Sequence, residues 1–214
     1  IGLRCGMFVS LDRTLPVVVL VAGHAGTGKT RFSKQLMARA VALRRPMVFL
    51  DKDTLGGLFS KALMQLHTGD PYDRDSEVFQ RHVRELEYQA LLDVALENAA
   101  LGVDSILCAP FGRECKTLES YTSFIERTFA GKAIPLLVWA HVEPEEAHRR
   151  IVKRQHPMDA YKLAHWDTYV SRRYKPDWIA TAEGNIRWLE SGSTNVEVLE
   201  WLSARLWMDS GAIQ

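Results

Sequence analysis

The chain has 214 residues, of which 47% are hydrophobic and 25% charged, and 27 Lys and Arg stand against 26 Asp and Glu. These values are typical of one folded α/β domain with a substantial core, and they exclude a disordered chain. The nearly balanced charge gives no overall electrostatic reason to bind nucleic acid or a membrane surface, so neither is expected as a partner. No apolar run reaches a membrane-spanning length, and three cysteines without metal-site spacing favour a reduced, cytoplasmic protein.

The first predicted element is a strand over residues 16–22, which runs directly into the sequence Gly-x-x-x-x-Gly-Lys-Thr at 23–30. A helical pattern follows at once, so this is the phosphate-binding P-loop in its expected context. Its glycines let successive N–H groups turn inward on a phosphate, and the dipole of the next helix favours the same anion. We expect Lys29 to reach the β- and γ-phosphates of ATP, and the Thr30 hydroxyl to bind their Mg²⁺. The predicted nucleotide-binding residues of the loop are Gly23, His24, Ala25, Gly26, Thr27, Gly28, Lys29 and Thr30.

Two carboxylates follow the second predicted strand. The helix that starts at Lys29 ends near Pro46, and a short buried strand at 47–50 then leads to Asp51 and Asp53. Parallel α/β sheets bind ligands at the carboxyl ends of their strands, so a pair of carboxylates in this place favours a functional role. One of the two could instead cap the helix expected over 55–66.

A long helix is expected next, over about 76–100, and a buried strand follows at 104–109. The apolar face of that helix is predicted to consist of Phe79, Val83, Leu86, Ala90 and Val94. Arg113, just beyond the strand, is a candidate for holding an anionic substrate or a phosphate, although a solvated loop arginine would look the same.

The last third of the chain contains a basic segment. After a helix near 118–129, a strand at 134–142 and a helix that opens at Pro144, eight Lys or Arg lie between Arg149 and Lys175, against two acids. This surplus predicts a lid over about 153–173 that is mobile without nucleotide and closes on triphosphate, since phosphoryl transfer needs positive charge near the γ-phosphate. A solvated basic helix face would give a similar pattern. A strand at 185–190 and a closing helix complete the chain.

The alternation of strands and helices predicts one parallel five-stranded sheet with helices on both faces, in a single domain over 1–214. The seven histidines lack the spacing of a zinc site. His24 and His156 could touch phosphate or could be solvated.

With the P-loop, the segment Leu50-Asp51-Lys52-Asp53-Thr54-Leu55 resembles the small-molecule P-loop kinases. This group includes gluconate kinase, shikimate kinase, chloramphenicol phosphotransferase and the zeta-toxin-like kinases. Residues 88–111 are similar to its helix and third strand, and residues 145–154 to the helix that leads into its arginine-bearing lid. The resemblance implies a three-layer P-loop NTPase sandwich with sheet order 2-3-1-4-5. It also implies transfer of the γ-phosphate of ATP, with Mg²⁺, to a hydroxyl of a metabolite, a sugar-like compound or an antibiotic.

The resemblance also implies roles for single positions. Asp53 matches the carboxylate that orients or deprotonates the accepting hydroxyl, and Asp51 matches the one that helps to hold hydrated Mg²⁺. Arg150 and Arg154 match arginines that approach the adenine or close over the phosphates, and the loop 190–193 lies where the group touches adenine. Many members have an acid at the end of the third strand, where this chain has Cys108, so the metal would rest on Thr30 and Asp51. The predicted site is therefore catalytic at Lys29, Asp53 and Arg154, nucleotide-binding also at Arg150, metal-binding at Thr30 and Asp51, and substrate-binding at Asp53 and Arg113.

Two other functions stay open. A regulatory ATPase or switch acting on a protein partner would need an element that changes shape with the γ-phosphate. A nucleotide kinase would use Arg113 and the basic lid to hold a second phosphate. The pair Asp51 and Asp53, together with the arginine-rich lid, favours a kinase of a small molecule, acting as a monomer or homodimer.

Overall fold

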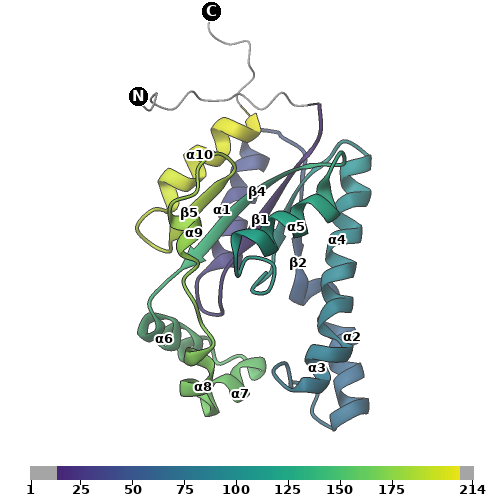
Figure 1. Cartoon of the computed structure of the whole chain (residues 1–214), viewed down its shortest axis with the longest axis vertical. Coiled ribbons are helices and arrows are strands. Elements are labelled where there is room, and N and C mark those ends of the chain that lie inside the picture. Colours follow the sequence, from purple (N-terminus) through teal and green to yellow (C-terminus); the bar gives the residue numbers. More distant parts are fainter. Residues whose placement is uncertain (1–13, 208–214) are drawn as a thin grey trace, which may run out of the picture.

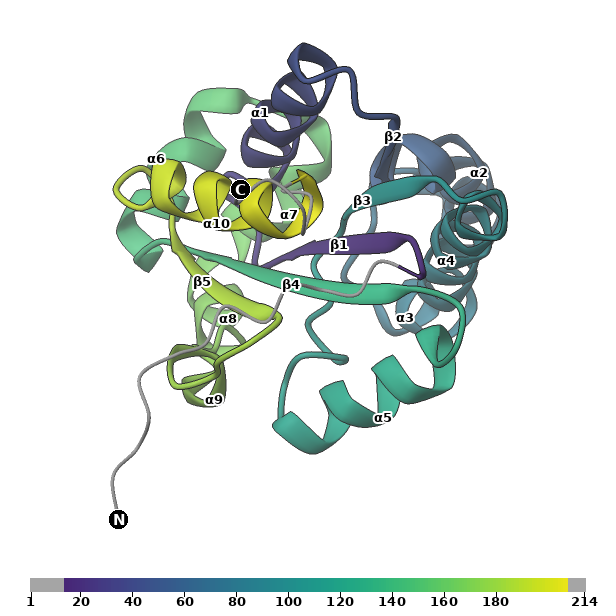
Figure 2. The same ribbon diagram turned by 90° about the horizontal axis from the view of Figure 1, so that it is seen from above.

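The computed structural model describes residues 14–207 and contains the five strands that the sequence predicts. They are β1 (Val17–Ala22), β2 (Met47–Asp51), β3 (Asp104–Cys108), β4 (Ile134–His141) and β5 (Ile186–Glu190). All neighbouring pairs are parallel and the order is β2-β3-β1-β4-β5 (Figures 1 and 2). The fold class and the strand order are thereby confirmed.

Helices cover both faces of this sheet (Figure 2). One face packs against α1 (Lys29–Ala42) and α10 (Asn195–Trp207), and the other against α4 (Arg84–Ala100), α5 (Leu118–Phe129) and α9 (Asp177–Ala180). Alternate residues of β1 belong to the two cores: Val18 and Leu20 to one, Val19 and Val21 to the other. A strand covered on both faces needs a continuous apolar run, which explains why residues 17–22 are all fully buried.

The predicted long helix is wrong in one respect, because it is broken at Val83 into α3 (Glu77–His82) and α4. Leu86 and Ala90, which the periodicity placed on the buried face, are exposed. The buried face of α4 instead begins with Arg84, Glu87 and Tyr88. The sequence pattern missed this face because two of its first residues are charged.

Two groups of helices project beyond the carboxyl ends of the strands (Figure 1). On one side lie α2 (Lys52–Thr68), α3 and the first part of α4. On the other lie α6 (Pro144–Arg154), the 3-10 turn η1 (Pro157–Asp159), α7 (Ala160–Ala164) and α8 (Trp166–Ser171). The expected lid segment therefore consists of short helices, and it faces α2 and α3 across the end of the sheet.

None of the helices among residues 14–207 has the length and apolar character needed to cross a membrane. Cys108 and Cys115 are buried free thiols, and Cys5 lies outside the described residues.

Candidate active site

The backbone conformation of the P-loop requires glycine at three positions. Gly23, Gly26 and Gly28 have φ angles of +130°, +79° and +87°, in the region that side chains disfavour. A Cβ on Gly23 would lie 2.2 Å from the carbonyl oxygen of Ala140, and one on Gly26 would lie 2.9 Å from that of Ala147. The loop therefore wraps closely against β4 and α6, and it leads into α1 at Lys29.

Lys29 lies across this loop, where its Nζ donates to the carbonyl oxygen of His24 at 2.7 Å. Burial lowers the pKa of Lys29, and the nearby charge of Arg154 lowers it further, while Asp53 and Asp51 act in the opposite sense. Lys29 is thus close enough to Arg154, Asp53 and Asp51 for each of these charges to act on its pKa. A triphosphate bound by the loop would give the ammonium a stronger anionic partner than a carbonyl oxygen.

The structure brings together the two residues predicted to hold a metal. The Thr30 hydroxyl donates to Asp51 Oδ2 at 3.3 Å, and Asp51 Oδ1 accepts from the N–H of Asp53 at 2.9 Å. Asp51 is therefore also the N-cap of α2, so the capping alternative and the metal role apply to the same residue. The residues fit Mg²⁺, which takes one or two protein oxygens and completes its shell with water and phosphate. No cluster of three or more metal-ligating side chains occurs within 14–207.

Cys108 lies where many kinases of the resembled group carry an acid. Its Sγ is 3.5 Å from the Thr30 hydroxyl, and burial raises the pKa of this thiol to about 11. It therefore stays a neutral thiol at physiological pH, and a soft neutral sulfur is a poor ligand for Mg²⁺.

Asp53 is the second residue of α2, and the hydrogen bonds to its carboxylate all go to one of the two oxygens. Its Oδ1 accepts from Lys52 Nζ at 2.8 Å and from Arg74 Nη2 at 3.1 Å, and 63% of its side chain is exposed. Desolvation acts to raise the pKa of Asp53, but the charges of Lys52, Arg74 and Lys29 outweigh it and lower that pKa to about 2. The carboxylate is thus ionised and oriented, and Oδ2 is left for a ligand.

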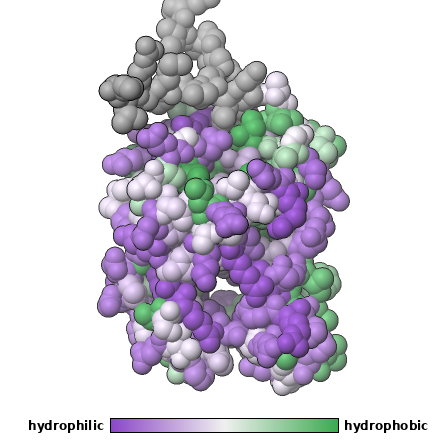
Figure 3. Space-filling view, in the orientation of Figure 1, coloured by the Kyte–Doolittle hydropathy of each residue, from purple (hydrophilic) through white to green (hydrophobic). Residues whose placement is uncertain are grey.

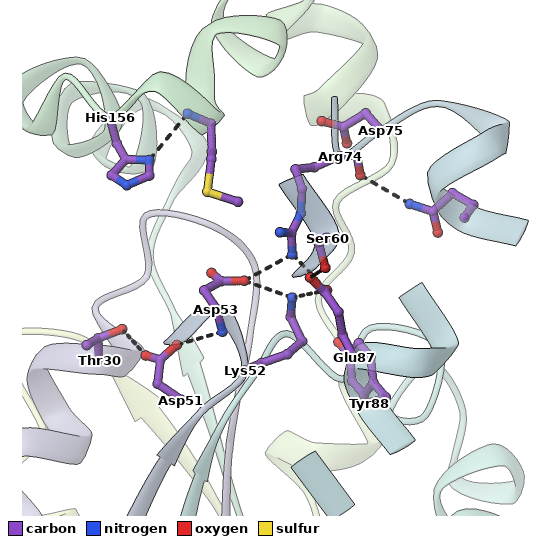
Figure 4. Close-up of polar contacts among 12 residues, drawn as sticks. Thr30, Asp51, Lys52, Asp53, Ser60, Arg74, Asp75, Glu87, Tyr88 and His156 are labelled. Carbon is purple, nitrogen blue, oxygen red and sulfur yellow. Dashed lines mark hydrogen bonds and ion pairs between the residues drawn. The ribbon is translucent and has the colours of Figure 1, made fainter. Parts of the chain in front are cut away.

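A buried ionic cluster that the sequence did not reveal supports Asp53 (Figure 4). We call Lys52, Ser60, Arg74 and Glu87 the Glu87 cluster. Glu87 is 3% exposed and accepts from Lys52 at 2.6 Å, from Arg74 at 2.7 Å and from the Ser60 hydroxyl at 2.5 Å. These contacts tie α2 to α4 and to the segment before α3.

Gly56 explains how Glu87 fits into this cluster. A Cβ on Gly56 would lie 2.9 Å from Glu87 Cγ, whereas one on Gly57 would meet no atom within 4 Å. The space that glycine leaves at position 56 is thus filled by the side chain of Glu87. The sequence held one signal of this cluster: Glu87, a charged residue, stands among the apolar residues of its helix.

The two predicted arginines of α6, Arg150 and Arg154, have different partners. Arg150 donates from Nη1 to Ser191 Oγ at 3.0 Å, and this hydroxyl lies 2.7 Å from where a Cβ on Gly28 would be. The loop 190–193 is therefore beside the P-loop. Arg154 makes a two-point ion pair with the buried Asp159, at 2.5 and 2.6 Å, and this carboxylate raises the pKa of Arg154.

The end of the lid segment binds the P-loop through contacts that the sequence did not predict. Tyr169 Oη accepts from the Ala25 N–H at 3.0 Å, and Arg173 donates to the Ala25 carbonyl oxygen at 3.2 Å. His24 Nε2 accepts from the Tyr174 N–H at 3.2 Å. Burial and the charge of Arg173 lower the pKa of His24 to about 4, so its ring is neutral at physiological pH and supplies no positive charge to a phosphate.

The sequence left the roles of Arg113 and His156 open, and both side chains have partners within the protein. Arg113 donates to Glu85 at 2.9 Å and to Gln80 at 2.9 Å, so its guanidinium is directed to α3 and α4 rather than into the site. His156 Nδ1 accepts from the N–H of Met158 at 3.3 Å and caps η1.

The parts of the site enclose a cleft. Figure 3 shows a hollow between the lobe of α6 to α8 and the lobe of α2 and α3, with a largely hydrophilic rim. In Figure 4 the carboxylates of Asp51 and Asp53 lie on one side of an open space and His156 lies on the other. The arrangement therefore provides a phosphate loop, a candidate metal site and a second, carboxylate-lined space next to it.

Comparison with known families gives a match over residues 18–176 to the model of an AAA domain. The chain belongs to this AAA domain family. No curated protein matches the sequence.

Solved structures show the same fold for this AAA domain at low sequence identity. A candidate kinase from Chloroflexus aurantiacus has a TM-score of 0.60 at 19% identity, and the alignment covers 90% of this chain and 100% of that one. Kti12 from Chaetomium thermophilum, solved with ADP-AlF3, has a TM-score of 0.57 at 16% identity, with 89% and 99% covered. The APS kinase CysC from Mycobacterium tuberculosis, solved with AMPPNP and APS, has a TM-score of 0.54 at 14% identity, with 90% and 98% covered.

Proposed function

We propose that this AAA domain is an ATP-dependent kinase that transfers the γ-phosphate to a hydroxyl of a small molecule. The observation that carries the proposal is the placement of Asp53. It lies two residues past the metal candidate Asp51, close enough to Lys29 for each charge to shift the pKa of the other group, yet its free oxygen faces the cleft.

The roles follow from the contacts. The P-loop N–H groups and Lys29 hold the β- and γ-phosphates, and Arg150 lies beside them with Ser191. Thr30 and Asp51 would hold Mg²⁺, which supplies charge neutralisation between the phosphates. Arg154 now pairs with Asp159. Its guanidinium would turn partly or wholly from Asp159 to the transferring phosphoryl group and neutralise the charge that develops there.

Asp53 would act on the acceptor. Its Oδ2 accepts a hydrogen bond from the incoming hydroxyl and aims the hydroxyl oxygen at the γ-phosphorus. A bond forms between this oxygen and the phosphorus as the bond from phosphorus to the β–γ bridging oxygen breaks, and ADP leaves with that electron pair. The hydroxyl proton passes through Asp53 to solvent as the new bond makes it acidic. Because Lys52 and Arg74 hold Asp53 firmly ionised, orientation outweighs strong basicity here.

The test is a screen for ADP release in the presence of ATP and Mg²⁺, with sugars, sugar acids, aminoglycosides, nucleosides and phenicols as acceptors. We expect one class to stimulate ADP release and to be recovered as its phosphate ester. ADP release that no acceptor stimulates, with inorganic phosphate as the other product, would contradict the proposal.

A regulatory ATPase is the second candidate, and one observation favours it. The segment with Tyr169, Arg173 and Tyr174 binds the same loop that would hold the phosphates, so nucleotide could change its position. The likeness to Kti12 concerns the fold alone. The buried thiols Cys108 and Cys115 support a cytoplasmic location for either function, which is also a proposal.

A further inference from the structure

We infer that the acceptor is an uncharged hydroxyl compound rather than a phosphorylated or carboxylated one. This inference rests on the proposed function and names the substrate class of the same site. It comes from the balance of charge on the acceptor side of the cleft, where carboxylates match the cations in number.

Four basic side chains of α2, α4 and the two segments next to them form two sets of ion pairs. Lys52 and Arg74 both pair with Glu87 and Asp53, at 2.6 to 3.1 Å. If either cation turned to a ligand, the buried Glu87 would lose one of its two ionic partners. Removing a partner from a buried ion pair is strongly destabilising. Arg74 Nη1 has no hydrogen-bond partner among the described residues and can donate to a polar group of an acceptor, but the charge of Arg74 is already balanced by these carboxylates.

The other two cations form a second, adjoining set of ion pairs. Arg84 donates to Glu114 at 3.0 Å and to Glu85 at 2.6 Å, and Arg113 donates to Glu85 at 2.9 Å. The ring of Tyr88 joins the two sets, since Arg84 lies 4.1 Å from its centroid and Lys52 lies 5.9 Å from it.

The charges of these groups cancel. The four cations face four carboxylates, and their members are Lys52, Arg74, Arg84, Arg113, Asp53, Glu85, Glu87 and Glu114. On the nucleotide side, Lys29, Arg150 and Arg173 lie at the P-loop and would serve the triphosphate. An anionic acceptor would therefore lie against a wall of zero net charge, next to the phosphate charges. On the opposite lobe Arg154 is paired with Asp159, and Lys162 is paired with Asp75.

An uncharged acceptor meets no such cost. Its hydroxyl can donate to Asp53 Oδ2, and its other polar groups meet a hydrophilic cleft (Figure 3). By the same reasoning a nucleoside monophosphate is a poor acceptor. Arg113, which was a candidate for holding a second phosphate, is instead bound to Glu85 and Gln80.

The first experiment needs no variant. The wild-type protein is incubated with γ-labelled ATP, Mg²⁺ and a small-molecule cell extract, and each labelled product is isolated. After enzymatic removal of the new phosphate, electrophoresis at neutral pH gives the charge of the acceptor. A neutral acceptor is expected, and an anionic one would overturn the inference while leaving the kinase assignment intact. A lack of any labelled small molecule would contradict the proposed function and the inference together.

The second experiment changes the charge of the wall. Glu87→Gln keeps the shape of the side chain and leaves the cluster with one surplus positive charge, so the preference should move toward anionic acceptors. We measure kcat/KM for matched pairs such as glucose and gluconate, or adenosine and adenosine monophosphate. The ratio of neutral to anionic acceptor should fall by roughly tenfold, the size of a typical single electrostatic contribution to specificity.

Ser60→Ala is the matched control, because it removes a hydrogen bond to Glu87 without any change of charge. Its ratio should equal that of the wild type. A ratio that stays unchanged in folded Glu87→Gln, or that falls equally in Ser60→Ala, would show that the cluster only supports the fold, and would overturn the electrostatic reading.

Discussion

At the scale of single residues, Lys29 is the group on which the nucleotide chemistry depends most. It is a cation at the first turn of α1, its position follows from the P-loop sequence, and its one strong contact is a carbonyl oxygen of the same loop. Its side chain therefore adds little to the core, and its charge is available to phosphate.

We predict that Lys29→Ala removes phosphoryl transfer without unfolding the chain. The β- and γ-phosphates lose a positive charge that acts mainly in the transition state, which typically costs 10²- to 10³-fold or more in kcat. Turnover is measured with thermal unfolding beside it, and Lys34→Ala, at an exposed position of α1, is the control. Undiminished transfer by a folded Lys29→Ala protein would disprove the assignment of the site.

Gly23 offers a test of the loop geometry by itself. A methyl group at this position would lie 2.2 Å from the backbone oxygen of Ala140, and β4 cannot give way. We expect Gly23→Ala to lower stability in urea by well over the ~1–2 kcal/mol that a left-handed backbone alone costs an alanine. Gly102→Ala is the matched control, since Gly102 also has positive φ (+81°) but no atom near its would-be Cβ. Similar losses in the two variants would mean that the loop is not packed as described.

At the scale of elements, α2, α3 and α4 are joined by the Glu87 cluster. Glu87 is buried with two cations, so replacing it by an apolar residue leaves both without their best partner. We predict that Glu87→Leu destabilises the protein by about 3–5 kcal/mol, against about 1 kcal/mol for Ser60→Ala. Chemical denaturation measures both. If both variants lost the same small amount of stability, pairing with Asp53 alone would be enough for Lys52 and Arg74.

The segment from about 153 to 173 is the second element with a predicted function. Its sequence has a surplus of positive charge that would favour closure on a triphosphate, although Arg154 pairs with Asp159 and Lys162 with Asp75. Its far end binds the P-loop through Tyr169 and Arg173. We predict slower hydrogen exchange over this segment when a non-hydrolysable ATP analogue is bound. Identical exchange with and without the analogue would count against closure.

Arg154 connects this segment to the chemistry. Its two-point pair with Asp159 holds the guanidinium at the base of the lid, close enough to Lys29 to lower the pKa of that amine. Arg154→Ala should lower kcat by roughly ten- to a thousand-fold, as other losses of transition-state charge do. Steady-state kinetics with Arg149→Ala as the control, an exposed arginine of α6, would test this. A loss confined to KM would place Arg154 in substrate binding only.

At the scale of the whole molecule, the sequence predicted the architecture well because the signals were local. Apolar runs such as 17–22 specify buried strands, and the P-loop indicates which strand lies at the centre of the site. The strand order came from the family resemblance. Thr30 and Asp51 were predicted as partners, and the structure brings them to 3.3 Å.

The acceptor side could not be predicted, for a physical reason. Arg74 and Glu87 are buried only because each satisfies the other across three segments, and a periodicity argument assigns buried positions to apolar residues. The same logic placed Leu86 inward, and it is exposed. The partners of Arg113 and His24 likewise lie far from them in the sequence and meet them only in the folded chain.

The most direct test of the central claim is Asp53→Asn, measured in two ways on the same preparation. Calorimetry gives the affinity for an ATP analogue with Mg²⁺, and acceptor-dependent ADP release gives turnover. If Asp53 orients the accepting hydroxyl, affinity stays as in the wild type while turnover falls by about 10²- to 10⁴-fold. Equal losses of affinity and turnover would place Asp53 in the metal site instead, and no loss of either would contradict its role in a kinase.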